Sequence, residues 1–96
     1  MSIKAALRLF ESASQEKNTF ATVRLADYYY YGKAGLDSNK TKAFDLYIQA
    51  QTMNKSVDFQ AQSYLSTGYM RQFGIGTKRS LDLARQDYEK ASKLGG

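Results

Sequence analysis

The sequence predicts an all-α fold, an α/α superhelix of antiparallel helical hairpins. Apolar residues recur at intervals of three and four, which is typical of helices rather than of the alternating pattern of strands. The chain contains no proline that would interrupt a helix, and 14% of its residues are aromatic. A small-aromatic-small pattern also recurs along the chain, as expected when one helical unit is repeated.

The first three helices are expected at residues 3–16, 20–31 and 39–53. In each range, small and apolar residues form a stripe along one face, which is the pattern of a helix that buries one side. Asn18 is a candidate N-cap for the second helix, because its side-chain oxygen can accept a hydrogen bond from the first helical turn. Two glycines in residues 32–35 then end that helix, and the asparagine that opens the third range can cap again.

The fourth and fifth helices follow the same plan. The fourth is expected at residues 58–73 and ends on Gly74-Ile75-Gly76, since glycine readily adopts the left-handed conformation that closes a helix. Ser80 can cap the fifth helix, which continues to residue 94. Its stripe again combines aliphatic, small and aromatic residues: Leu81, Ala84, Tyr88 and Ala91.

The third and fifth helices match each other without a gap. The matching residues Ala84, Tyr88 and Ala91 follow Ala43, Tyr47 and Ala50 at an offset of 41. Gly32 likewise matches Gly74 at an offset of 42. We therefore interpret residues 1–96 as one domain, about two and a half units of a longer superhelix. In this frame 3–16 is an unpaired second helix, 20–53 the first repeat and 58–94 the second repeat.

Four residues of the stripes are expected to be buried between helices: Ala43, Tyr47, Ala84 and Tyr88. Alanine lets two helix backbones approach closely, and a tyrosine fills the space that remains. The tyrosines at 28–31 cannot all face one way on a helix, so we expect Tyr29 in the core and at least one of its neighbours at the surface.

The composition argues against an enzyme. The chain has no histidine and no cysteine, which removes the imidazole base of a Ser-His-Asp site, the thiolate nucleophile and the Cys/His zinc sites. We expect no catalytic residue, cofactor, metal or small-molecule ligand. The net charge of +5 permits acidic partners. It does not demand nucleic acid, and a nucleic-acid-binding helical repeat is the less favoured alternative.

Glycines, alanines and tyrosines of the first repeat are spaced as in a known family: Ala21, Leu25, Ala26, Tyr29, Gly32, Gly35, Leu36, Asn39, Lys42, Ala43, Tyr47 and Ala50. The second copy is similar, with Gly68, Gly74, Gly76, Ser80, Ala84, Tyr88 and Ala91. The pattern resembles the Sel1-like repeat (SLR) family, relatives of the tetratricopeptide repeat with a longer, glycine-marked turn. The resemblance implies a protein-protein interaction scaffold. The sequence departs from it at Thr67 and Arg71, where leucine and tyrosine are usual.

A further likeness lies in short segments: Asp27-Tyr28 with Tyr31-Gly32, Gly68-Tyr69-Met70 and Leu83-Ala84-Arg85. These are similar to the C-terminal repeats of the lumenal adaptor subunits of the HRD ubiquitin ligase. This resemblance implies a membrane-embedded RING ubiquitin ligase as protein partner, in endoplasmic-reticulum-associated degradation, and a location in the endoplasmic reticulum lumen. The acceptor triplets Asn39-Lys40-Thr41 and Asn54-Lys55-Ser56 agree with that compartment. The alternative is a peptide-binding scaffold of another, cytoplasmic pathway.

The partner-binding residues are expected on the first helix of each repeat, which usually lines the concave side of a stack of hairpins. Residues outside the packing stripe of those helices combine aromatic, thioether and guanidinium groups, which are enriched at binding hot spots. They are Arg24, Tyr28, Tyr30, Tyr64, Met70 and Arg71. For the tyrosines the alternative is packing against a neighbouring repeat, and for the arginines a solvated helix face. Self-association remains a second mode of binding.

Overall fold

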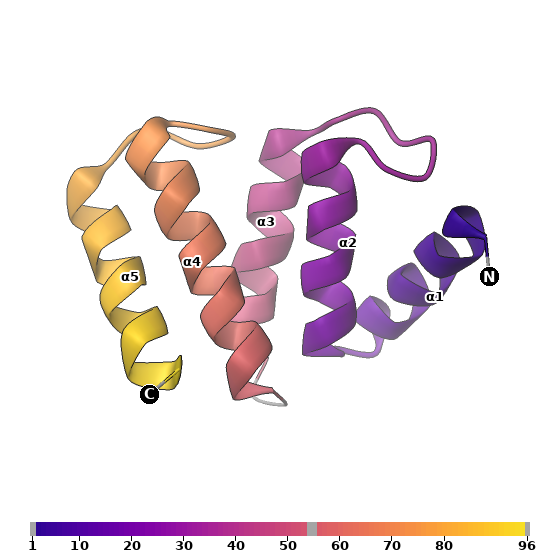
Figure 1. Cartoon of the computed structure of the whole chain (residues 1–96), viewed down its shortest axis with the longest axis horizontal. Coiled ribbons are helices and arrows are strands. Elements are labelled where there is room, and N and C mark those ends of the chain that lie inside the picture. The colour runs from indigo at the N-terminus through magenta and orange to yellow at the C-terminus, as the bar shows by residue number, and fades with distance from the viewer. Residues whose placement is uncertain (1, 54–55, 96) are drawn as a thin grey trace.

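The computed structural model describes residues 2–53 and 56–95, and within these ranges it contains helices and no strand (Figure 1). The helices there are α1 (Ile3–Gln15), α2 (Thr19–Tyr31), α3 (Lys40–Gln51), α4 (Val57–Phe73) and α5 (Leu81–Gly95). The predicted all-α fold is therefore confirmed. In these same ranges no helix has the length and apolar character needed to span a bilayer.

The helices stack in chain order. Each packs on the next, and α2 also packs on α4, so the first helices of the two hairpins meet across one surface. Figure 1 shows α2 to α5 side by side with alternating direction, while α1 leans away from the others. The array measures 39 × 27 × 17 Å, the flattened shape expected when each hairpin contacts only its neighbours.

Side-chain caps begin the helices where the sequence predicts them. The side-chain oxygens of Asn18, Asn39 and Ser80 accept hydrogen bonds from the backbone N–H three residues later, at 2.9, 2.9 and 3.2 Å. Each bond satisfies one of the N–H groups that have no partner within a helix. These three predicted caps are confirmed.

Glycines end α2 and α4 and also join the hairpins. Gly32 and Gly74 adopt the left-handed conformation as C-caps, with φ of 70° and 67°. Gly76 has a different role, because a Cβ atom there would lie 2.4 Å from the backbone oxygen of Lys40. The second turn therefore rests directly on the start of α3, and only glycine fits at this contact.

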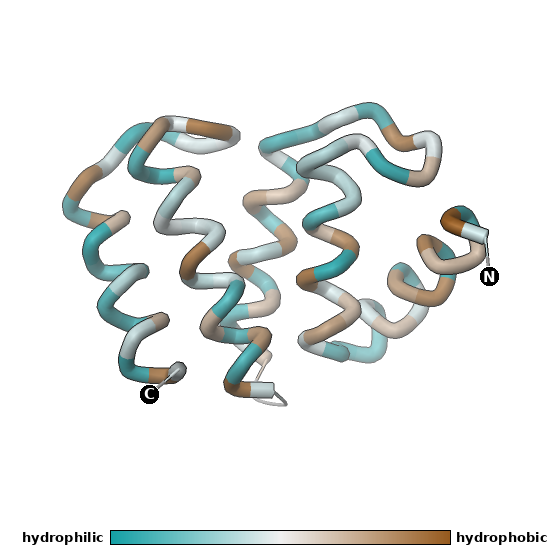
Figure 2. The backbone as a smooth tube through the Cα atoms, viewed as in Figure 1, coloured by the Kyte–Doolittle hydropathy of each residue, from teal (hydrophilic) through white to brown (hydrophobic). Residues whose placement is uncertain are grey.

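The core consists of small residues with few large ones between them. Ala26, Ala43 and Ala50 are fully buried, and the Tyr47 ring packs with them in one cluster. Figure 2 shows hydrophobic and hydrophilic residues mixed along each helix, as expected for helices that bury one face. The predicted burial of Ala43, Tyr47 and Ala84 is confirmed.

Tyr88 differs from this prediction, since it is only partly buried. Its ring lies against Gly68, where a Cβ atom would approach it to 2.8 Å. Its hydroxyl donates to the Gln72 side chain at 2.7 Å. Tyr88 thus packs α5 onto α4 while part of its surface stays exposed.

The second hairpin replaces an apolar contact by a buried polar network. Asp87 accepts hydrogen bonds from the Thr67 hydroxyl and the Arg71 guanidinium, both at 2.9 Å. Only 4% of the Asp87 side chain is exposed. In the first hairpin the equivalent positions, 42 residues earlier on α2 and 41 earlier on α3, hold Leu25, Tyr29 and Leu46. The two departures from the family pattern therefore form one unit with the aspartate.

Replacing Tyr47 by alanine is expected to lower the free energy of unfolding by about 3–5 kcal/mol, because a buried aromatic ring is lost. Tyr47→Phe keeps the ring but removes a hydrogen-bond donor to Asp27, so we expect a smaller loss of about 1–2 kcal/mol. Urea denaturation measures both. A loss below about 1 kcal/mol for Tyr47→Ala would contradict the interior position of the ring.

The polar network gives a second prediction. Asp87→Leu leaves Arg71 without its carboxylate and Thr67 with only the Tyr64 carbonyl oxygen as acceptor, and because Arg71 is partly exposed we expect a loss of about 1–3 kcal/mol in the free energy of unfolding. The triple variant Thr67→Leu, Arg71→Tyr, Asp87→Leu installs the residues of the first hairpin. Its free energy of unfolding should lie within about 1 kcal/mol of that of the parent chain, since apolar groups often replace a buried ion pair without loss of stability. A triple variant less stable than Asp87→Leu would refute the equivalence of the two sets.

Candidate functional site

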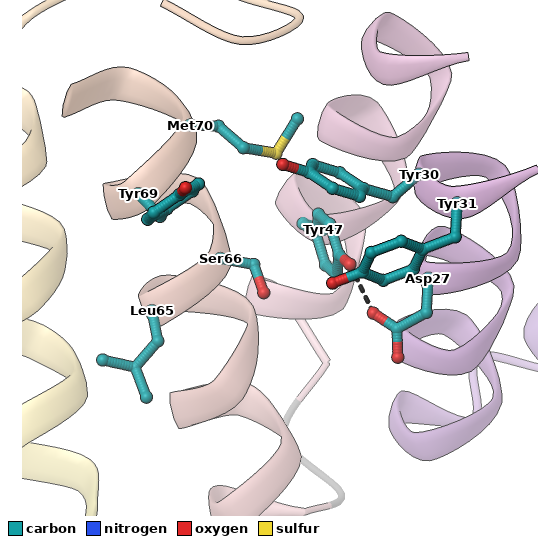
Figure 3. Close-up of a pocket in the computed structure, with 8 residues that line it drawn as sticks. All are labelled: Asp27, Tyr30, Tyr31, Tyr47, Leu65, Ser66, Tyr69 and Met70. Carbon is teal, nitrogen blue, oxygen red and sulfur yellow. Dashed lines mark hydrogen bonds between the residues drawn. The ribbon is translucent and has the colours of Figure 1, made fainter. Parts of the chain in front are cut away.

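A cleft with a volume of about 510 Å³ opens between α2 and α4 (Figure 3). This volume is within the usual range of roughly 300–1,000 Å³ for sites that bind a small ligand. The lining residues come from three helices: Asp27, Tyr30 and Tyr31 from α2, Tyr47 from α3, and Leu65, Ser66, Tyr69 and Met70 from α4. The cleft thus exists only where the two hairpins meet.

The floor of the cleft is fixed by hydrogen bonds. The Tyr47 hydroxyl donates to one carboxylate oxygen of Asp27, as the dashed line in Figure 3 shows, and Arg24 donates to the other at 2.5 Å. Burial raises the pKa of the Tyr47 hydroxyl above its ordinary value, and the hydrogen bond to Asp27 adds to this effect. Tyr47 therefore stays protonated and serves as a neutral donor rather than as an acid or base.

The walls of the cleft are exposed and apolar. Tyr31 on α2 is 66% exposed and Tyr69 on α4 is 49% exposed. Leu65 lies one turn before Tyr69 in the lining, and exposed Phe73 follows one turn after it beside the cleft, with the rings of Tyr69 and Phe73 4.9 Å apart. Single exposed apolar residues are common on proteins, but a continuous row beside a cleft indicates a binding surface.

Two of the residues predicted to bind a partner line this cleft, Tyr30 and Met70. The expectation that Met70 lies outside the packing stripe is wrong. Its side chain is 1% exposed and belongs to the core cluster, because position 70 lies one turn after Thr67 on the buried face of α4. Met70 can support the cleft from below but presents almost no surface of its own.

The two other predicted aromatic residues point away from the cleft. The Tyr28 ring packs edge-on against Phe10 of α1, with ring centres 5.4 Å apart. Tyr64 lies on the α5 side of α4, where the ammonium of Lys90 is 5.5 Å from its ring centre. Tyr28 thus follows the alternative of packing between neighbouring helices.

The two predicted arginines are both engaged within the chain. Arg24 pairs with Asp27, donates to Gln62 of α4 at 3.2 Å and lies over the rings of Phe20 and Phe59. It therefore joins α2 to α4 beside the cleft. Arg71 pairs with the buried Asp87, so the expectation of a free guanidinium at this position is wrong.

Sequence reasoning missed most of the cleft, namely Asp27, Tyr31, Leu65, Ser66 and Tyr69. The signal was present in the spacing, since 27 and 31 on α2, and 65 and 69 on α4, are each four residues apart and share a helix face. Periodicity alone did not show which of two apolar faces of α4 is buried.

The described residues contain no group of three or more potential metal ligands. Asn39 of the first acceptor triplet is exposed and uses its side-chain oxygen as the cap of α3. The second triplet, at Asn54, falls outside the described residues.

Comparisons with known proteins agree with the repeated architecture. The Sel1 repeat family matches residues 2–18, 19–51 and 60–96. Protein sel-1 homolog 2 of Homo sapiens is 32% identical over 88 residues, which are 92% of this chain and 12% of that protein. No solved structure matches the chain at a significant level.

Two further relatives are named as ERAD-associated E3 ubiquitin-protein ligase components. HRD3B of Arabidopsis thaliana is 31% identical over 83 residues, 86% of this chain and 13% of that protein. HRD3 of Candida glabrata is 32% identical over 85 residues, 88% of this chain and 9% of that protein. The chain thus spans only about a tenth of the length of these relatives. With all three family matches and the helical hairpins in agreement, the chain belongs to the Sel1 repeat family.

Proposed function

We propose that this chain is a protein-interaction scaffold whose cleft between α2 and α4 holds a segment of a partner protein. The observation that carries the proposal is a cleft with a fixed floor, lined by tyrosines of α2 and by exposed apolar residues of α4. Tyrosine suits such a surface, because its ring gives contact area at low entropic cost while its hydroxyl stays in water.

The chemistry of the cleft supports binding rather than catalysis. Its carboxylate, Asp27, already accepts bonds from Arg24 and Tyr47, and its most buried hydroxyl remains a neutral donor. The Tyr47 hydroxyl is therefore not held ready to release a proton near neutral pH. A surface fixed in this way loses little entropy when a partner binds.

The proposed partner belongs to a ubiquitin ligase complex of endoplasmic-reticulum-associated degradation, with a membrane-embedded RING ligase as the specific candidate. Two relatives are named as components of such ligases, which supports this assignment. The proposed location is the endoplasmic reticulum lumen, on the same basis. A Sel1 repeat scaffold that binds peptides in another pathway is the alternative.

The double variant Leu65→Ser, Tyr69→Ser is expected to lose most of its capture of the RING ligase in a pull-down from detergent-solubilised membranes. Both side chains are exposed, so the thermal melting curve should stay unchanged. The matched control is Leu9→Ser, Leu83→Ser, which removes equally exposed leucines from α1 and α5. Equal capture by the cleft variant and the parent chain would exclude the cleft as the docking surface.

A further inference from the structure

The positive charge of this chain is concentrated along one edge. We define the loop edge as the turns 32–39 and 74–80 with the first turns of α1, α3 and α5. It carries six basic residues and two acidic ones, Asp37 and Asp82. The basic residues are Lys4, Lys33, Lys40, Lys42, Lys78 and Arg79. The rest of the chain holds eight basic and seven acidic residues, so the loop edge accounts for four of the five net charges.

Contacts between the turns hold this edge together. Gly35 of the first turn lies against the Lys4 side chain of α1, with 3.8 Å from a Cβ position to Cε. Gly76 of the second turn lies against the backbone of Lys40. Figure 1 shows both turns along the same side of the array. The six basic residues therefore lie along one rim of the array.

Two lysines of this rim lie over tyrosines that line the cleft. The ammonium of Lys40 lies 4.0 Å from the ring centre of Tyr30, and that of Lys33 lies 5.5 Å from the ring centre of Tyr31. Cations of the chain itself therefore already occupy positions over these aromatic rings. A basic side chain from a partner would meet repulsion at this end of the cleft.

The cleft offers no free negative charge to offset that repulsion. Asp27 is the only acidic residue in its lining. One carboxylate oxygen of Asp27 accepts from Arg24 and the other from Tyr47. The lining that α4 contributes is instead uncharged, with Leu65 and Tyr69 exposed. The positive charge beside the cleft thus comes from the loop edge, and the exposed apolar area of its α4 side comes from these two residues.

From this complementarity we infer that the segment bound in the cleft is an acidic peptide with apolar anchor residues. Its carboxylates lie along the loop edge near Lys33 and Lys78, and its apolar side chains fill the space between Tyr31 and Tyr69. The inference rests on the proposed function and specifies the chemistry of the partner. A bilayer is disfavoured, because these apolar residues line a concave cleft rather than a flat or convex surface.

The test measures binding of fluorescent peptides to the purified chain by anisotropy. The probes are a peptide of repeating Glu-Glu-Leu-Phe and its counterpart of repeating Lys-Lys-Leu-Phe. We expect only the acidic peptide to bind, and its affinity to fall as sodium chloride is raised. Lys33→Glu, Lys78→Glu should weaken that binding by about tenfold or more, because like charges then face each other. Both lysines are exposed, and circular dichroism confirms that the variant is folded.

The matched control is Arg8→Glu, Lys93→Glu, which changes the net charge equally but lies outside the loop edge. It should bind the acidic peptide within about twofold of the parent chain. Failure of the acidic peptide to bind, equal binding of both peptides, or equal losses in both variants would overturn the inference. So would tighter binding to phosphatidylserine vesicles or to oligouridylate. If Leu65→Ser, Tyr69→Ser still abolishes ligase capture in any of these cases, the proposed scaffold stands and only the acidic partner is wrong.

Discussion

Small residues set the distance between neighbouring helices in this chain, and the larger side chains depend on that distance. Ala26, Ala43 and Ala50 are fully buried, so α2 and α3 approach closely enough for the Tyr47 ring to fill the remaining space. In the second hairpin Gly68 likewise leaves the space that the Tyr88 ring fills. A larger residue at any of these positions would separate the helices and change the angle between hairpins.

The same packing determines the cleft. Tyr47 belongs to the core through its ring and to the cleft through its hydroxyl, which holds Asp27 in place. Asp27 in turn orients Arg24, and Arg24 bridges to α4 through Gln62. A change in the spacing of α2 and α3 would therefore move the surface between α2 and α4. Core and binding surface cannot vary independently in this fold.

The sequence was sufficient for the fold and insufficient for the site. Helices, caps and glycine turns depend on local chemistry, so Asn18, Asn39, Ser80, Gly32 and Gly74 could be assigned from spacing alone. The rotation of α4 about its axis depends on contacts with α3 and α5, which periodicity does not contain. Thr67 and Asp87 look like surface residues until both are seen to face Arg71 in the interior. That dependence on distant partners explains why Met70 and Arg71 were placed on the wrong side of the helix.

The buried polar network also bears on how the chain finds its correct pairing during folding. Repeated hairpins of similar sequence can exchange partners, and such mispairing is a characteristic failure of repeat proteins. If α5 docked on α2, Asp87 would face Leu25 and Tyr29 in place of Thr67 and Arg71 and would be buried without a cationic partner. The free-energy cost of an unpaired buried carboxylate disfavours that arrangement. A single acidic residue thus favours the pairing of the second helix of this hairpin with its own first helix.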